Sequence, residues 1–270
     1  MQKENHTEKR IGIFDSGVGG LTILKPMVSL MPNEKFYYFG DTKNVPYGTK
    51  SPKEIAKIGV EAYKKLRKLG IKMLVIGCNT TSIYGIKAIK EIADVPIIEL
   101  IHPGVLAVKE CGCKNILLLA TEATINSGSI QSLLKKEIDD VKVEGIATQD
   151  MVITVENGNS NNEEGKKVVH RYLDMVTIRP DSVLLSCTHF PALSKFIADY
   201  FNNKGIDVNI ISPAEKCAEI AKEKLKEIGK LTEFGNLSIE YFCSGDLEKF
   251  TKSGNILLDD DLIIKNVKKL

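Results

Sequence analysis

The feature that most constrains this chain is the alternation of short, continuous apolar runs with longer amphipathic segments along its 270 residues. Continuous runs of Val, Ile and Leu are typical of strands that are covered on both faces, as in parallel sheets. Strands that alternate with helices predict an α/β fold with right-handed crossovers. The predicted strands are Ile11–Phe14, Lys35–Phe39, Met73–Gly77, Ile116–Ala120, Val183–Ser186, Val208–Ile211 and Ile239–Phe242.

Local signals at helix starts and in loops refine this prediction. A capping Ser followed by Pro, with Glu three residues after the Ser, occurs at Ser51 and again at Ser212, and it predicts a helix start at each place. The second helix is expected from Ala214 to Lys230, with one apolar stripe. The polar stretch from Glu156 to Gly165 predicts an exposed loop.

Composition is that of an ordinary globular protein. Hydrophobic residues make up 43% and charged residues 27%, and 37 Lys and Arg against 35 Asp and Glu give a net charge of +2. This balance is too small for a nucleic-acid-binding surface. The first ten residues are polar, without the apolar core of a secretory signal, and no apolar run approaches membrane-spanning length. We therefore expect a cytoplasmic protein with no nucleic-acid or membrane partner.

The six cysteines show no regular framework, in a chain long enough to bury a core without staples, which indicates a reducing compartment. None of them forms the Cys-x₂-Cys pair of a zinc knuckle, so no metal site is predicted. Four are interpreted as structural thiols, since small thiols are commonly buried. These four are Cys111, Cys113, Cys217 and Cys243.

The turn from Asp15 to Gly20 follows a strand and opens a helix, as a dinucleotide-binding loop does. However, Thr22 stands where the third small residue of that motif belongs, and Asp15 would repel a pyrophosphate. On its own, Asp15 is equally an ordinary helix N-cap. Tyr47 and Gly48 would alone form only a turn, although the hydroxyl and N–H groups there could reach a carboxylate. No nucleotide cofactor is predicted.

Cys78 and Cys187 differ from the other cysteines, because each is predicted where a strand ends and a helix begins. Open α/β sheets bind ligands at this carboxyl edge. A helix N-terminus lowers the pKa of a thiol, so each cysteine is a candidate thiolate base; a core cysteine at a strand end is the alternative. His189, beside the second thiol, is a candidate proton relay.

Four segments together resemble the glutamate racemases, within the cofactor-independent aspartate/glutamate racemase superfamily. The matching segments are Phe14–Leu21, Gly40–Gly48, Cys78–Thr80 and Cys187–Pro191. Weaker similarity extends through Thr121–Ser127 and Ser244–Phe250. The order of these motifs is far more specific than any one of them.

The resemblance implies two α/β domains with mainly parallel sheets that face each other across an active-site cleft. The first domain would be discontinuous, comprising residues 1–98 and 211–270, and would carry Asp15 and Cys78. The second, residues 99–210, would be inserted into it and would carry Cys187 and His189. The resemblance also implies a homodimer.

The implied activity is the interconversion of L- and D-glutamate by two-base proton transfer at Cα, without cofactor or metal, to supply D-glutamate for peptidoglycan synthesis. By the same resemblance, Cys78 takes the proton from D-glutamate with help from Asp15, and Cys187 takes it from L-glutamate with help from His189. Glu156 would match an acidic position beside the cleft. The implied substrate contacts are Asp15, Ser16, Tyr47, Gly48, Asn79, Thr80, Thr121, Thr188 and His189.

Three positions depart from the family pattern. Ser186 replaces a usual Gly, His102 replaces a common acid, and residues 148–156 lack the usual Cys-Pro-Leu and Val-Pro-Leu. None of these changes removes an expected catalytic group. The alternatives that stay open are racemisation of another amino acid such as aspartate, a non-catalytic binding protein that kept the cleft, and a redox dithiol protein.

Overall fold

The computed structural model describes residues 9–270, and the expectation about the polar N-terminus falls almost wholly outside this range. Within it, ten strands form two separate sheets, and every strand pair is parallel. The larger sheet has the order β10-β9-β2-β1-β3-β4, and the smaller has the order β6-β5-β7-β8. The predicted α/β class with mainly parallel sheets is confirmed.

The strands of the larger sheet are β1 (Arg10–Asp15), β2 (Lys35–Gly40), β3 (Ile71–Ile76), β4 (Ile97–Ile98), β9 (Ser238–Cys243) and β10 (Val267–Lys269). Those of the smaller sheet are β5 (Asn115–Ala120), β6 (Lys142–Ala147), β7 (Ser182–Ser186) and β8 (Asn209–Ile211). We call each sheet with its helices the first and the second domain, respectively. The chain passes to the second domain after β4 and returns after β8.

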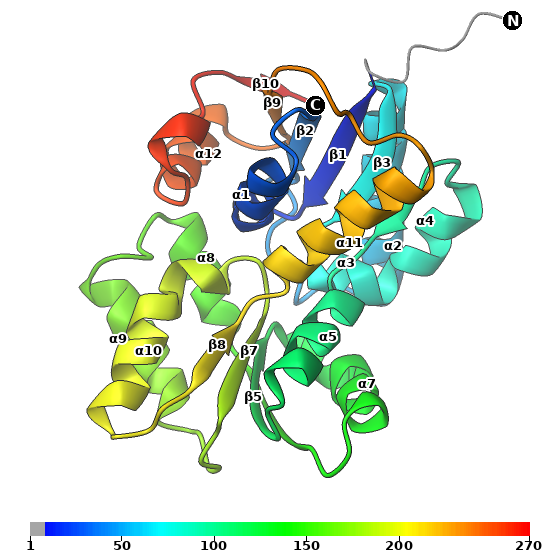
Figure 1. The fold of residues 1–270 in the computed structure, drawn as a ribbon. Helices are drawn as coiled ribbons and strands as arrows, with labels where there is room; N and C mark the ends of the chain where they lie inside the picture. Colours follow the sequence, from blue (N-terminus) through cyan, green and yellow to red (C-terminus); the bar gives the residue numbers. More distant parts are fainter. Residues whose placement is uncertain (1–8) are drawn as a thin grey trace, which may run out of the picture.

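The helices that accompany the first domain are α1 (Leu21–Leu30), α2 (Pro52–Lys68), α3 (Asn79–Tyr84), α4 (Ile86–Ile92), α11 (Ala214–Glu227), α12 (Leu247–Asn255) and the 3₁₀ turn η3 (Asp260–Leu262). Those of the second domain are α5 (Ile101–Cys111), α6 (Glu122–Ser127), α7 (Ser129–Glu137), α8 (Gln149–Glu156), α9 (Glu163–Leu173), the 3₁₀ turn η2 (Phe190–Leu193) and α10 (Ser194–Asn203). Figure 1 shows the first domain in the upper part and the second in the lower part, with α11 packed against both α1 and α5.

All seven predicted strands are present, with bounds shifted by one or two residues. Three strands were missed, and their sequences explain why. β4 has only two residues and β10 has three. β6 (KVEGIA) has a single buried residue, so it lacks the continuous apolar run that marks the others.

The helix-start signals had different outcomes. Ser51 forms the predicted capping box, since its side chain accepts the N–H of Glu54 and the Glu54 side chain accepts the N–H of Ser51. At Ser212 the helix start is confirmed, because α11 begins at Ala214 as expected, but the capping box is absent: Pro213 is the N-cap, and the Ser212 hydroxyl accepts the N–H of Ala214 at 3.2 Å. Among the described residues, no helix is long and apolar enough to cross a membrane.

Candidate active site

The expected site residues lie just after the carboxyl ends of strands in both sheets. Asp15 ends β1, Cys78 follows β3 by two residues, Thr121 follows β5, and Cys187 follows β7. Because all these strands are parallel, their carboxyl ends lie at one edge of each sheet.

Hydrogen bonds between the domains show that the two edges face each other. The Thr188 hydroxyl donates to Asp15 Oδ2 at 3.0 Å. Thr80 and Thr121 share a bond of 3.1 Å between their hydroxyl oxygens. The two candidate thiols and their neighbours are therefore brought together at the domain junction.

On the first-domain side, Asp15 is completely buried. Its Oδ1 accepts the N–H of Gly17 at 3.0 Å, so it closes the glycine-rich turn rather than capping α1, whose N-cap is Gly20. Burial raises the pKa of Asp15 above its ordinary value, against the opposing influence of the His189 charge. Its Oδ2 lies 3.0 Å from the place that a Cβ on Gly77 would occupy, next to Cys78.

Cys78 lies at the N-cap of α3, where the sequence placed it, but its protonation differs from the expectation. Burial, together with the negative charge of Asp15, raises the pKa of the Cys78 thiol to about 12. The predicted lowering by the helix N-terminus is therefore wrong for this thiol, because loss of hydration outweighs the helix dipole of the six-residue α3. Cys78 is a neutral thiol in the ligand-free protein.

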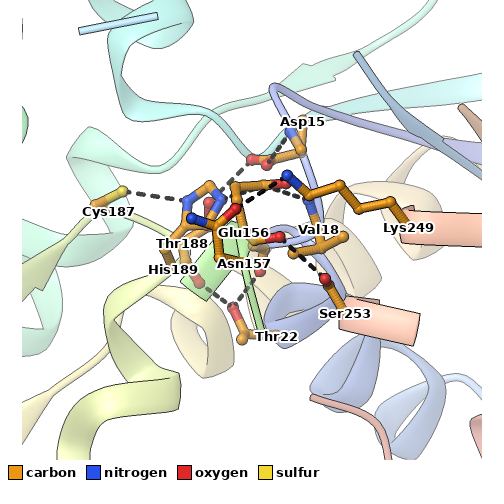
Figure 2. Close-up of polar contacts among 12 residues, drawn as sticks. Asp15, Val18, Thr22, Glu156, Asn157, Cys187, Thr188, His189, Lys249 and Ser253 are labelled. Atoms are coloured by element: carbon orange, nitrogen blue, oxygen red, sulfur yellow. Dashed lines mark hydrogen bonds and ion pairs between the residues drawn. The ribbon is translucent and has the colours of Figure 1, made fainter. Parts of the chain in front are cut away.

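On the second-domain side, three side chains form a connected chain (Figure 2). Sγ of Cys187 lies 3.6 Å from Nδ1 of His189, and Nε2 of His189 lies 2.6 Å from Oε1 of Glu156. Burial alone would lower the pKa of His189, but the hydrogen bonds to Cys187 and Glu156 and their negative charges raise it well above its ordinary value. The imidazole is thus held as a cation beside the sulfur, and a cation stabilises a thiolate.

Two expectations concerned Glu156: an exposed loop from 156 to 165, and an acidic position beside the cleft. The predicted exposed loop from 156 to 165 is wrong at both ends, because Glu156 is the buried last residue of α8 and Glu163 begins α9. Its Oε1 also accepts the N–H of Val18 from the first domain at 2.8 Å, and its backbone carbonyl accepts the Ser253 hydroxyl at 2.9 Å (Figure 2). Glu156 therefore connects the second-domain histidine to the first domain.

Glycines at 17 and 19 are needed for this close approach. A Cβ on Gly17 would overlap the Glu156 carboxylate, and one on Gly19 would lie 2.6 Å from His189 Nδ1. Side chains at these positions would displace the ion pair, which gives the glycine-rich turn a packing role in place of the nucleotide role that the sequence already excluded.

The remaining expected contacts lie around the same junction. The hydroxyl of Tyr47 donates to Asp41 at 2.6 Å, so Asp41 fixes the orientation of the Tyr47 side chain. Burial and the nearby Asp41 raise the pKa of Tyr47 well above its ordinary value, which keeps it a neutral donor. Asp41, which the sequence did not single out, also accepts the Ser244 hydroxyl at 2.6 Å. Ser16 follows Asp15 in the sequence and Asn79 follows Cys78, and both side chains are buried.

The other cysteines fit the sequence interpretation only in part. Cys217 and Cys243 are free and buried, as expected. Cys111 and Cys113 are joined in a disulfide, and Cys111 is exposed, so their interpretation as buried thiols is wrong for this pair. Cys187 is followed by the 3₁₀ turn η2 rather than directly by an α-helix. No cluster of metal-ligating side chains occurs within residues 9–270.

Comparisons with known proteins agree on one family. The Asp/Glu/Hydantoin racemase family matches residues 24–221. The glutamate racemase of Geobacter metallireducens is 36% identical over 262 residues, which cover 94% of each chain, and that of Oceanobacillus iheyensis is 33% identical over 94% of this chain and 93% of its own. The structure of glutamate racemase from Francisella tularensis in complex with D-glutamate is similar with a TM-score of 0.87, at 29% identity over 98% of both chains.

Proposed function

This chain belongs to the Asp/Glu/Hydantoin racemase family, and we propose that it interconverts L- and D-glutamate by proton transfer at Cα between Cys78 and Cys187. The choice of glutamate over aspartate is supported by relatives named glutamate racemase at 33% to 36% identity over most of the chain. It is also supported by the similarity to a structure that binds D-glutamate.

The observation that carries the mechanism is the different environment of the two thiols. Cys187 lies beside an imidazole whose pKa is raised, whereas the pKa of Cys78 is raised to about 12. One side is therefore suited to accept a proton and the other to donate one. Racemisation within one binding event needs both a proton acceptor and a proton donor, because one proton leaves one face of Cα and another arrives at the opposite face.

In the L-to-D direction, the Cys187 thiolate takes the Cα proton and the Cys78 thiol delivers its own proton to the opposite face. The product state has a Cys187 thiol and a Cys78 thiolate, and the D-to-L reaction reverses each transfer. His189 supports the charge on Cys187, and Asp15 assists on the Cys78 side. Glu156 holds His189 in place and in its charged form.

The carbanion between the two transfers is stabilised by fixed dipoles at a site that excludes water. We propose that the substrate's polar groups are bound by Ser16, Tyr47, Gly48, Asn79, Thr80, Thr121 and Thr188, together with Asp15 and His189. Support comes from their burial at the domain junction. Among the side chains, the buried carboxamide of Asn79 has no hydrogen-bond partner within the described residues.

The resemblance to the glutamate racemases supports further proposals about this chain. We propose domain boundaries at 1–98 plus 211–270 and at 99–210, which agree with the two sheets to within one residue, since Ile211 still pairs with β7. We also propose a homodimer, a cytoplasmic location and a role in supplying D-glutamate for peptidoglycan. We propose no cofactor, metal or nucleic-acid partner.

The test of the function is circular dichroism of the purified protein with L-glutamate, D-glutamate and each enantiomer of aspartate, without added cofactor. Both glutamate enantiomers should converge to zero ellipticity, and neither aspartate should change comparably. Equal rates on aspartate would overturn the substrate assignment. No change with any of the four would overturn racemisation.

A further inference from the structure

A second buried carboxamide without a partner lies at the domain junction, and it belongs to Gln149. This residue begins α8, two residues after the end of β6. Both its Oε1 and its Nε2 are inaccessible to solvent and form no hydrogen bond within the described residues. A buried carboxamide that forms no hydrogen bond destabilises the folded protein, so a partner is expected in the functional state.

The surroundings of Gln149 place it against proposed substrate contacts. A Cβ on Gly48 would overlap Gln149 Oε1 and would lie 2.9 Å from Thr121 Cβ, so the Gln149 carboxamide packs directly on Gly48 beside Thr121. Thr121 in turn shares a hydrogen bond with Thr80, the neighbour of the other unpaired carboxamide, Asn79. The two unpaired carboxamides thus approach one cluster from opposite domains.

Backbone atoms make the contact between Gly48 and the second domain, and the Gln149 carboxamide takes no part in it. The Gly48 carbonyl accepts the N–H of Ala123 at 3.2 Å, which fixes the first-domain loop on α6. The next residue along from Gln149, Asp150, points elsewhere and pairs with Arg171 at 2.5 Å among exposed side chains. Gln149 is therefore the residue of this helix start that faces the site.

We propose that Gln149 is a further substrate-binding residue, whose side-chain amide donates a hydrogen bond to a carboxylate of the bound amino acid from the second-domain side. A substrate with two carboxylates supplies the acceptor that the buried Nε2 lacks. The contact adds a second-domain donor opposite the Asn79 carboxamide of the first domain. This inference rests on the proposed glutamate racemisation and assigns Gln149 a role in binding, not in proton transfer.

Two substitutions of Gln149 test the proposal. Gln149→Leu keeps the approximate volume and removes the donor, and a hydrogen bond to a charged group is worth about a tenfold to hundredfold change in binding. We expect KM for both glutamate enantiomers to rise by about tenfold or more, with kcat changed by less than about threefold. Gln149→Glu places a carboxylate against a carboxylate, so KM should rise further and the increase should shrink as the pH is lowered.

Gln131→Leu is the matched control. Gln131 lies in α7 of the same domain, its Oε1 is also buried without a partner, and its Nε2 donates to the carbonyl of Ile125 at 3.1 Å. The same substitution there should lower the melting temperature without changing KM. A loss of binding caused only by a weakened fold would appear in both variants.

Binding of D-glutamate, measured by isothermal titration calorimetry, separates this inference from the proposed function. If the unaltered protein binds D-glutamate but does not racemise it, the function fails, and the affinities of the variants still decide the role of Gln149. If Gln149→Leu binds D-glutamate and turns it over with unaltered Kd and KM, the inference is wrong and the function stands. Absence of binding by the unaltered protein overturns both.

Discussion

Oε1 of Glu156 lies 2.6 Å from Nε2 of His189, while the same oxygen accepts a backbone N–H from the facing domain at 2.8 Å. This one carboxylate oxygen therefore supports the charge of the histidine and ties it to the junction between the domains. Because both residues are buried, water does not screen the pair as it would at the surface. The protonation of His189 thus depends directly on Glu156.

The first prediction concerns Glu156→Gln, which keeps the shape of the side chain and removes its charge. Since Glu156 raises the pKa of His189, the variant should lose the imidazole proton at a lower pH. We expect kcat/KM to fall by about 10- to 100-fold in both directions equally, because the equilibrium constant cannot change. The high-pH limb of the pH profile for L-glutamate turnover should move to lower pH.

Glu163→Gln serves as the control for that substitution. Glu163 is an exposed first-turn residue of α9, seven positions along the chain, and its Lys166 partner lies 4.0 Å away. Its replacement should leave the pH profile unchanged. A Glu156→Gln variant with the unaltered high-pH limb would contradict the assigned role of this carboxylate.

The second prediction concerns the reactivity of the two thiols in the absence of substrate. Cys78 and Cys187 are about equally buried, at 6% and 7% exposure, so the raised pKa of Cys78 should appear as slower alkylation at equal access. Iodoacetamide at about pH 7.5 should modify Cys187 at least about tenfold faster than Cys78, because thiolates are the reactive form. Peptide mass spectrometry measures both rates in one sample.

His189→Asn extends this comparison. Removing the cation beside Sγ should slow the alkylation of Cys187 and leave that of Cys78 nearly unchanged. Faster modification of Cys78 than of Cys187 in the unaltered protein would contradict the assignment of Cys78 as the neutral thiol in the absence of substrate.

The third prediction concerns stability as a function of pH. The folded protein holds His189 with a raised pKa, whereas a histidine in the unfolded chain titrates near 6.5. The stabilisation from the protonated imidazole is therefore fully present below about pH 6.5 and is lost as the pH rises through the folded-state pKa. Between about pH 6 and about pH 8.5, the free energy of unfolding should fall more in the unaltered protein than in a His189→Asn/Glu156→Gln double variant.

The double variant is used because a single change would leave the other member of the buried pair without its partner. His170→Asn is the control for replacing a histidine outside the junction: His170 lies in α9 against the ring of Tyr200. Urea unfolding at each pH gives the free energies. If the free energy of unfolding changed with pH equally in the unaltered protein and in the double variant, the Glu156–His189 pair would not be the source of the pH dependence.

Much of the fold was predictable because buried parallel strands have an unmistakable composition. The predicted strand Met73–Gly77 overlaps β3 along the apolar run Met73–Ile76, every residue of which is buried. β6 was not predictable in this way, since a partly exposed edge strand needs no apolar run. The Ser-Pro-x-Glu signal located both helix starts, at Pro52 and at Ala214, but the reciprocal capping hydrogen bonds form only at Ser51.

For the site, the sequence located residues but not their interactions. The positions of Cys78 and Cys187 follow from strand ends, which are local features. The Glu156–His189 pair joins the end of α8 to the loop after β7, and no spacing rule encodes a contact between segments so far apart. The pKa of Cys78 was predicted to be lowered, whereas it is raised, because burial depends on the complete fold.

Racemisation in deuterated water shows whether the proton transfers run between two cysteines on opposite faces of Cα. In the L-to-D direction, the Cys78 thiol carries deuterium from solvent and delivers it to the product, while Cys187 takes protium from the substrate. Early in the reaction, D-glutamate should therefore be labelled at Cα and the remaining L-glutamate should be unlabelled. With D-glutamate as the substrate the pattern should be mirrored. Label appearing in recovered L-glutamate as fast as in product, or unlabelled D-glutamate, would contradict the two-cysteine account.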